Sequence, residues 1–185
     1  MKSLLDCLAR CQGAIDSFTE FSGRLISWLT VVMMLATCGV VLLRYVLGSG
    51  SIAFQETIIY LHATLFLMGI AYTLKRDGHV RVDIFYRRFS ARARAWVDLF
   101  GCLLLLLPVT VLIFVLCWDY VWASWSIREA SGDPKGLPWV YYLKTLLLLM
   151  PVSVLIQAVG EILKNILVIA GHAQPRAYVA DEARI

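Results

Sequence analysis

The stretch Lys75-Arg76-Asp77-Gly78-His79-Val80-Arg81-Val82-Asp83 separates two long apolar segments of the chain. Together with the arginines that follow it, this stretch places seven of the 17 Lys and Arg residues within 20 positions, from residue 75 to residue 94. Short loops rich in Lys and Arg face the cytoplasm when they connect membrane spans. The stretch therefore predicts which side of a membrane one loop occupies, and through it the topology of the chain.

Four blocks of almost uninterrupted apolar sequence surround the basic stretch. Leu25 to Leu43, Thr57 to Leu74 and Leu99 to Trp118 contain no Asp, Glu, Lys or Arg, and Trp139 to Gly160 contains only Lys144. About 20 helical residues cross a hydrocarbon core of about 30 Å. Buried helices of a soluble bundle would carry polar stripes, which these blocks lack. The sequence therefore predicts an all-α integral membrane protein with four transmembrane helices.

The blocks also predict how the chain is divided. We expect an N-terminal segment, a four-span membrane domain and a tail, at residues 1–24, 25–170 and 171–185. We expect the four spans at about residues 25–46, 54–74, 96–126 and 138–166. The loop between the first two spans contains no Lys or Arg, in contrast to the basic loop after the second. This asymmetry predicts that both termini and the basic loop lie on the cytoplasmic side.

The N-terminal segment has helical periodicity. Apolar residues recur every three or four positions, at Leu4, Leu8, Cys11, Ile15, Phe18 and Phe21. This pattern favours an amphipathic helix that lies in the cytoplasmic membrane interface, and a disordered tail is the alternative. The basic loop, where aromatic residues alternate with arginines, predicts a second interfacial segment. Ser90 is the expected N-cap of the helix that follows it.

The sequence offers few residues that could carry chemistry. A haem site would need opposed histidines at membrane depth, but only His62 lies in a span, where we expect it to hydrogen-bond to a neighbouring helix. The chain has no phosphate loop, HExxH motif or serine-nucleophile motif. We therefore predict no catalytic, cofactor-binding or metal-binding residues and no enzymatic activity. Nucleic acid is an unsuitable partner, because the positive charge lies beside the membrane spans.

A few charged and polar residues near the span ends are candidate contacts with other subunits or with lipids. Arg44 closes the first span and Glu56 opens the second, so they could form an ion pair or reach the interface separately. Tyr60 lies one turn from Glu56 on the same face. Lys144 enters the fourth span, where its stem favours a snorkelling position over a contact with another subunit.

Two further patterns concern the surfaces of the spans. Trp118, Trp122 and Trp125 fall on one helix face, which favours an aromatic belt at the outer interface, with a docking surface for a partner helix as the alternative. Gly69 and Thr73 have the spacing of small residues that allow helices to pack closely.

The chain resembles the DctQ-like small membrane subunits of TRAP transporters, the tripartite ATP-independent periplasmic transporters. The resemblance covers about Leu25 to Ile166, and the block His79-Val80-Arg81-Val82-Asp83 after the second span is its most specific part. Weaker parts of the resemblance are Arg44-Tyr45, Glu56 with Tyr60, Gly69-Ile70-Ala71-Tyr72, Gly132 to Trp139, and Lys144.

The resemblance implies a four-span subunit of the bacterial inner membrane with both termini in the cytoplasm. It implies that a large multi-span subunit holds the substrate and sodium sites, and that the small subunit enlarges the scaffold for an elevator-type movement. A periplasmic binding protein would deliver an organic acid anion to the outer face of both membrane subunits. The resemblance gives His79, Arg81 and Asp83 a role in ordering the inner loop, through headgroups or the large subunit, and makes Arg44 and Glu56 the outer-side charges.

Two other functions stay open at this point. A small, self-sufficient four-span drug exporter could use Glu56 as its proton site. A four-helix membrane redox enzyme would need a chromophore or reactive thiols. An autonomous ion-coupled transporter usually keeps carboxylates or broken helices near the membrane centre, and this sequence shows neither there.

Overall fold

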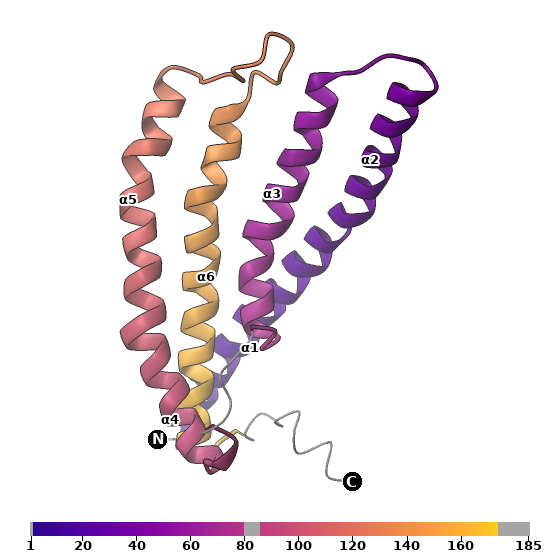
Figure 1. Cartoon of the computed structure of the whole chain (residues 1–185). Coiled ribbons are helices and arrows are strands. Elements are labelled where there is room, and N and C mark those ends of the chain that lie inside the picture. The colour runs from indigo at the N-terminus through magenta and orange to yellow at the C-terminus, as the bar shows by residue number, and fades with distance from the viewer. Residues whose placement is uncertain (1, 80–85, 174–185) are drawn as a thin grey trace.

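The computed structural model describes residues 2–79 and 86–173 of the chain. Its helices are α1 (Lys2–Ser27), α2 (Leu29–Tyr45), α3 (Ile52–Lys75), α4 (Ala91–Gly101), α5 (Leu107–Ser126) and α6 (Val140–Ile169), with the short helical segments η1 (Tyr86–Arg88) and η2 (Cys102–Leu106). No strand occurs among the described residues. The all-α class predicted from the sequence is therefore confirmed (Figure 1).

Four helical segments are long and apolar enough to cross a membrane, as predicted. They are Ser3–Tyr45, Ile52–Lys75, Ala91–Ser126 and Val140–Ile169. The third has 36 residues, which corresponds to about 54 Å of helix and exceeds a hydrocarbon core of about 30 Å. It contains α4, η2 and α5, so it begins well before the predicted span.

The two ends of the molecule differ in what they carry. One end holds the loop between α2 and α3 and the loop between α5 and α6, and we call it the loop end (Figure 1). The opposite end holds the start of α1, the end of α6 and helix α4, and we call it the terminal end. The start of α1 and the end of α6 therefore share one end, as an even number of spans requires.

Helix α6 is the centre of the packing. It contacts α1, α3, α4 and α5, whereas α2 packs mainly on α3 and has no buried residue. The buried core is made mostly of small and medium side chains, such as Ala71, Ala95, Val121 and Ala158. Without a strong hydrophobic force between helices in lipid, small residues allow the close backbone approach that holds spans together.

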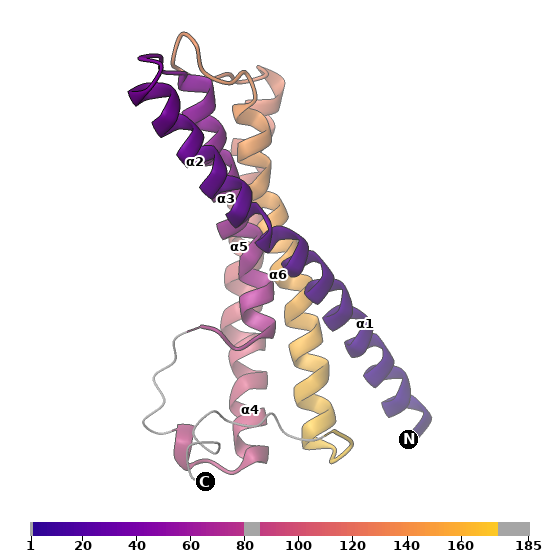
Figure 2. The same ribbon diagram turned by 90° about the vertical axis from the view of Figure 1, so that its right-hand side faces the viewer.

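Helix α1 turns its polar face toward the bundle, whereas its pattern predicted an amphipathic helix lying in the membrane interface. Its polar residues Asp16 and Glu20 point at α3 and α6, while the apolar Phe18 and Phe21 are 57% and 69% exposed. It runs obliquely beside α3 and α6 and leads almost directly into α2 (Figure 2). The physical reason is that the bundle offers Lys75 and Gln157 as partners, so the carboxylate face is satisfied by protein and the aromatic face is left for lipid.

Local sequence features explain several helix ends. The Ser90 hydroxyl accepts a hydrogen bond from the Ala93 N–H at 3.3 Å, which confirms the predicted N-cap of α4. Between α4 and α5, the Leu107 N–H bonds to the Cys102 carbonyl five residues earlier, so a π-turn comes just before Pro108. A proline removes an N–H and crowds the preceding turn, and the wider π-turn relieves that crowding.

Three helices end in the same type of cap. After α3, the Gly78 N–H bonds to the Thr73 carbonyl and the Asp77 N–H bonds to the Leu74 carbonyl, which is a Schellman motif. The ends of α5 and α6 repeat this pattern. Asp77 and Arg128 occupy the left-handed position at φ 59° and 47°, where glycine is usual.

Candidate subunit interface and the polar contacts that fix the spans

At the loop end, Glu56 on α3 binds the loop that joins α5 to α6. Its carboxylate accepts a hydrogen bond from the Leu137 backbone N–H at 2.5 Å and another from the Ser131 hydroxyl. The Gly136 N–H bonds to the Asp133 carbonyl at 3.0 Å and closes a turn in this loop. A Cβ atom at Gly136 would lie only 2.6 Å from Glu56 Oε1, so this glycine makes room for the carboxylate. Glu56 thus anchors one outer loop to a different span.

Of the two alternatives for Arg44 and Glu56, the structure does not form the ion pair. Arg44 is exposed at the last turn of α2 and forms no ion pair with any described residue, while both Glu56 oxygens are occupied by the α5–α6 loop. The exposure of Arg44 agrees with the other interpretation, in which it reaches the interface alone. Tyr60 lies one turn from Glu56 as expected, and its buried hydroxyl has no hydrogen-bond partner within the described part of the chain.

Lys144, in the first turns of α6, binds two residues at the end of α5. Its ammonium group pairs with Glu129, just beyond the end of α5, and lies 4.1 Å from the centre of the Tyr120 ring. The Lys144 ammonium lowers the pKa of the Glu129 carboxyl below its ordinary value. Arg128 places Glu129 here, because the left-handed turn brings the Glu129 N–H onto the Ser124 carbonyl at 3.0 Å.

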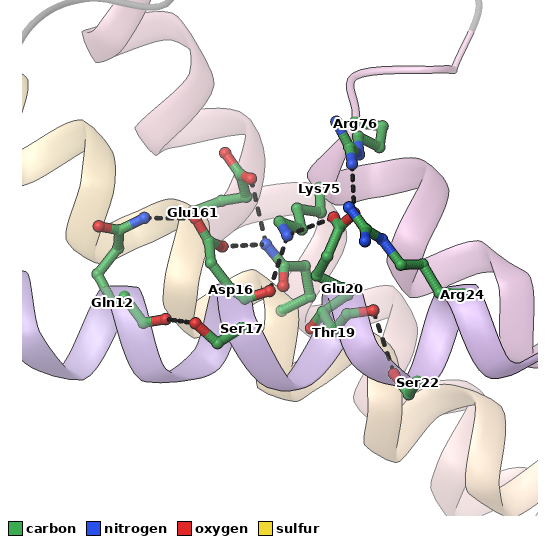
Figure 3. A network of polar contacts seen from close by, with 12 residues as sticks. Gln12, Asp16, Ser17, Thr19, Glu20, Ser22, Arg24, Lys75, Arg76 and Glu161 are labelled. Atoms are coloured by element: carbon green, nitrogen blue, oxygen red, sulfur yellow. Dashed lines mark hydrogen bonds and ion pairs between the residues drawn. The ribbon is translucent and has the colours of Figure 1, made fainter.

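A larger polar network joins α1, α3 and α6 toward the terminal end (Figure 3). The Glu20 carboxylate accepts hydrogen bonds from Lys75 Nζ at 2.7 Å, from Arg24 Nε at 2.8 Å and from the Arg76 guanidinium. Lys75 also donates to the Asp16 carbonyl at 2.7 Å. The Glu20 carboxylate on α1 therefore binds both basic residues at the end of α3, Lys75 and Arg76.

The same network continues onto α6. Gln157, which is fully buried, donates to Asp16 Oδ1 at 3.2 Å and to Glu161 Oε1 at 3.3 Å. Gln12 donates to Asp16 Oδ2 at 2.6 Å from one turn earlier in α1. The close approach that permits these bonds depends on Gly160, where a Cβ would lie 3.0 Å from Ile15 Cγ2. Asp16 is thus the link between α1 and the central helix.

Sequence reasoning missed this network, although signals for it were present. Asp16 and Glu20 have i, i+4 spacing on one helix, and Gln157 and Glu161 have it on another, so each pair shares a face. Lys75 and Arg76 supply the opposite charge. An amphipathic pattern can be satisfied by lipid or by protein, and the sequence pattern alone favoured lipid for the apolar side without identifying partners for the polar side.

The three tryptophans of α5 have two different environments. Trp118 and Trp122 are exposed, at 50% and 68%. Trp125 donates a hydrogen bond from Nε1 to Thr145 Oγ1 at 2.9 Å and packs edge-on against the rings of Tyr141 and Tyr142. Trp125, which is still 40% exposed, therefore joins α5 to α6, and the other two indoles are more open to lipid or to a partner.

The remaining predicted positions lie near the basic loop and in α3. His79 is exposed, just after the cap of α3. Arg81 and Asp83 lie outside the described residues. His62 is exposed and stacks on Phe66, and the expected hydrogen bond to a neighbouring helix is not made within the described part of this chain.

The described residues show no arrangement typical of a metal centre. Within residues 2–79 and 86–173, no group of three or more His, Cys, Asp or Glu side chains could hold a metal ion. Three charged residues near the span ends, Glu20, Glu56 and Lys144, each bind a group from another element of the chain. Chemically, these contacts fix helix ends in place.

Comparison with known proteins agrees with this arrangement. The family model "Tripartite ATP-independent periplasmic transporters, DctQ component" matches residues 33–167. The C4-dicarboxylate TRAP transporter small permease protein DctQ of Vibrio cholerae is 28% identical over 126 residues, which are 66% of this chain and 51% of that protein. The chain thus spans about half the length of this curated relative. No solved structure matches the chain. Since the family model covers well over half of the sequence, the chain belongs to the DctQ family of TRAP transporter components.

Proposed function

We propose that this inner-membrane member of the DctQ family is the non-catalytic small subunit that scaffolds the large, ion-coupled subunit of a TRAP transporter. In this role it would widen the fixed part of the complex against which the large subunit's transport domain moves. The substrate site and any sodium sites would belong to the large subunit. A periplasmic binding protein would deliver an organic acid anion to the outer face.

The observation that carries the proposal is that charged groups beside the spans bind partners within this chain. Glu56 accepts two hydrogen bonds from the α5–α6 loop, Lys144 pairs with Glu129, and Glu20 binds Lys75. A transport site needs polar groups that can exchange a substrate or an ion for water. Groups that are bonded within the protein suit a static scaffold instead.

The proposal includes an orientation. Helix α4 lies at the terminal end and the end of α3 points toward it, and the basic stretch of the sequence stands between these two helices. Short basic loops face the cytoplasm. Both termini would then lie in the cytoplasm, and the loop end would face the periplasm. The loop around Gly136, which Glu56 holds in place, would present a fixed surface to the binding protein.

The C4-dicarboxylate named for the Vibrio cholerae relative fits the class of an organic acid anion. The relative's substrate supports an organic acid anion as the substrate class for this chain. The individual substrate is found by measurement. Uptake of radiolabelled C4-dicarboxylates into proteoliposomes is the direct assay.

The test uses three preparations: the chain alone, the large subunit alone, and both together with the binding protein. We expect a stable copurifying complex, and sodium-dependent uptake only from the complete set. Uptake by the chain alone would overturn the scaffold role. Drug resistance conferred by the chain alone, and lost in Glu56→Gln, would favour a self-sufficient exporter instead.

A further inference from the structure

One face of α3 carries a histidine at membrane depth and is left open by the described rest of the chain. Gln55, Ile59, His62 and Phe66 are all exposed and follow one another at helical spacing, so they form a single stripe. We call these four residues the α3 stripe. His62 lies ten residues after Ile52, about 15 Å along the helix and close to the middle of a hydrocarbon core of about 30 Å.

His62 has no hydrogen-bond partner among the described residues, and lipid cannot supply one. Its ring stacks on Phe66 with the ring centres 6.2 Å apart, and neither ring nitrogen bonds to a described residue. A neutral imidazole carries one donor and one acceptor. Hydrocarbon offers neither, and titratable side chains within spans are therefore rare and usually face protein or water.

The outward faces of α5 and α6 differ from the α3 stripe. Their exposed residues through the middle of the membrane are apolar, as lipid requires: Leu112, Val115, Leu149, Val152 and Ile156. The other sides of α3 are covered by α2, α6 and α1. The stripe is thus the part of α3 that this chain leaves uncovered.

A small residue extends the stripe by one turn. Gly69 follows Phe66 by three positions, and a Cβ atom built there would meet nothing within 4 Å. The small-residue spacing of Gly69 and Thr73 is therefore not used for packing at Gly69 within this chain. In membranes such glycines let a second helix approach closely.

We propose that the α3 stripe is the surface on which a transmembrane helix of the large TRAP subunit packs, with a hydroxyl, amide or carboxylate of that helix hydrogen-bonded to His62. The proposal rests on the proposed function, which supplies a large membrane partner. A second copy of this chain is the alternative occupant, and homodimer adducts in the cross-linking experiment would reveal it.

The experiment uses the complete chain co-expressed with the large subunit in membranes. The photoreactive residue p-benzoylphenylalanine replaces Ile59 or Phe66 on the stripe, and Leu112 or Val115 on α5 as matched lipid-facing controls. We expect an adduct with the large subunit from the two stripe positions and none from the α5 positions. Adducts from α5 alone, or homodimer adducts from the stripe, would overturn the proposal.

A second measurement tests the hydrogen bond itself. His62→Leu should lose copurified large subunit, whereas His62→Gln, which keeps a donor and an acceptor, should retain it. If the two variants copurify equal amounts of the large subunit, the hydrogen bond of His62 is not part of the interface. If the wild-type chain fails to copurify at all, the scaffold function fails as well; if it copurifies but cross-links through α5, only the α3 surface is wrong.

Discussion

The carboxylate of Glu20 on α1 lies 2.7 Å from the ammonium group of Lys75 at the end of α3, although 54 residues separate them in the chain. Both side chains are largely shielded, with 19% and 16% of their surface exposed. This contact ties the N-terminal helix to the bundle. Removing one partner of a shielded ion pair leaves the other charge without compensation.

Glu20→Gln should therefore loosen α1 from the bundle. The carboxamide cannot neutralise Lys75 and Arg76, so limited proteolysis in detergent should cut α1 faster and the thermal midpoint should fall. Arg10→Gln is the matched control, since Arg10 is exposed on the same helix and its bond among the described residues is to the Asp6 carbonyl of its own helix. Unchanged cleavage of α1 in Glu20→Gln would show that apolar packing alone holds this helix.

Two glycines of α1 should respond in opposite directions to alanine. In Gly23→Ala the new Cβ would lie 2.2 Å from Tyr72 Cδ2 and 2.8 Å from Tyr72 Cβ, so α1 must move away from α3. Overpacking of this kind costs about 1–3 kcal/mol. In Gly13→Ala the Cβ meets nothing within 4 Å, and the better helix former should add about 0.8 kcal/mol.

The free energy of unfolding, measured by denaturant titration in mixed micelles, checks this pair of variants. Gly23→Ala should unfold at a lower denaturant concentration than wild type, and Gly13→Ala at a higher one. If both variants shift in the same direction, the close packing of α1 on Tyr72 is not present in solution.

Trp125→Phe should destabilise the contact between α5 and α6, because it removes the bond from the indole to Thr145 while keeping an aromatic ring. A lost hydrogen bond of this type costs about 0.5–1.5 kcal/mol. Trp122→Phe should leave the unfolding free energy almost unchanged, since Trp122 is 68% exposed. The same denaturant titration compares the two, and equal losses would contradict the different roles assigned to them.

The spans could be predicted from the sequence because their evidence is local. An uninterrupted apolar block such as Leu99 to Trp118 meets a length requirement set by the bilayer, whatever surrounds it. The Ser90 cap is equally local, since its partner Ala93 lies three residues away. Such features depend on spacing along one helix and need no knowledge of how the helices are arranged.

The polar contacts could not be predicted in the same way, because each charged residue had several partners within reach. Arg44 is closest to Glu56 in sequence, yet Glu56 bonds to Leu137, 81 residues further on. Lys144 could reach the membrane interface, and its partner Glu129 is brought within reach by a left-handed turn at Arg128. Which partners Glu56 and Lys144 bind depends on how α3, α5 and α6 pack against one another.

Arg128→Gly should stabilise the protein. An L-residue in the left-handed conformation costs about 1–2 kcal/mol, and glycine gives back about 0.5–1 kcal/mol through its greater freedom in the unfolded chain. The expected net gain is about 0.5–1 kcal/mol. Gly171→Ala is the reverse change at the equivalent cap of α6, where φ is 72°, and should lose about 1 kcal/mol. Thermal unfolding in detergent measures both, and a loss in Arg128→Gly would mean that its side chain makes a stabilising contact.

Acidification should selectively weaken the contact between Glu129 and Lys144. The ammonium group lowers the pKa of Glu129 in the folded protein below its ordinary value of 4.5. A carboxyl whose pKa is lowered by folding contributes stability that is fully present above its ordinary pKa and is lost as pH falls through the folded-state pKa. Wild type should therefore exceed Glu129→Gln in thermal midpoint at neutral pH, and the difference should shrink below about pH 4.5.

Lys135→Gln, an exposed change in the same loop, should show no such pH-dependent difference from wild type. A gap between wild type and Glu129→Gln that stays constant from neutral pH to pH 3 would mean that the carboxylate charge is not what stabilises this end of α5.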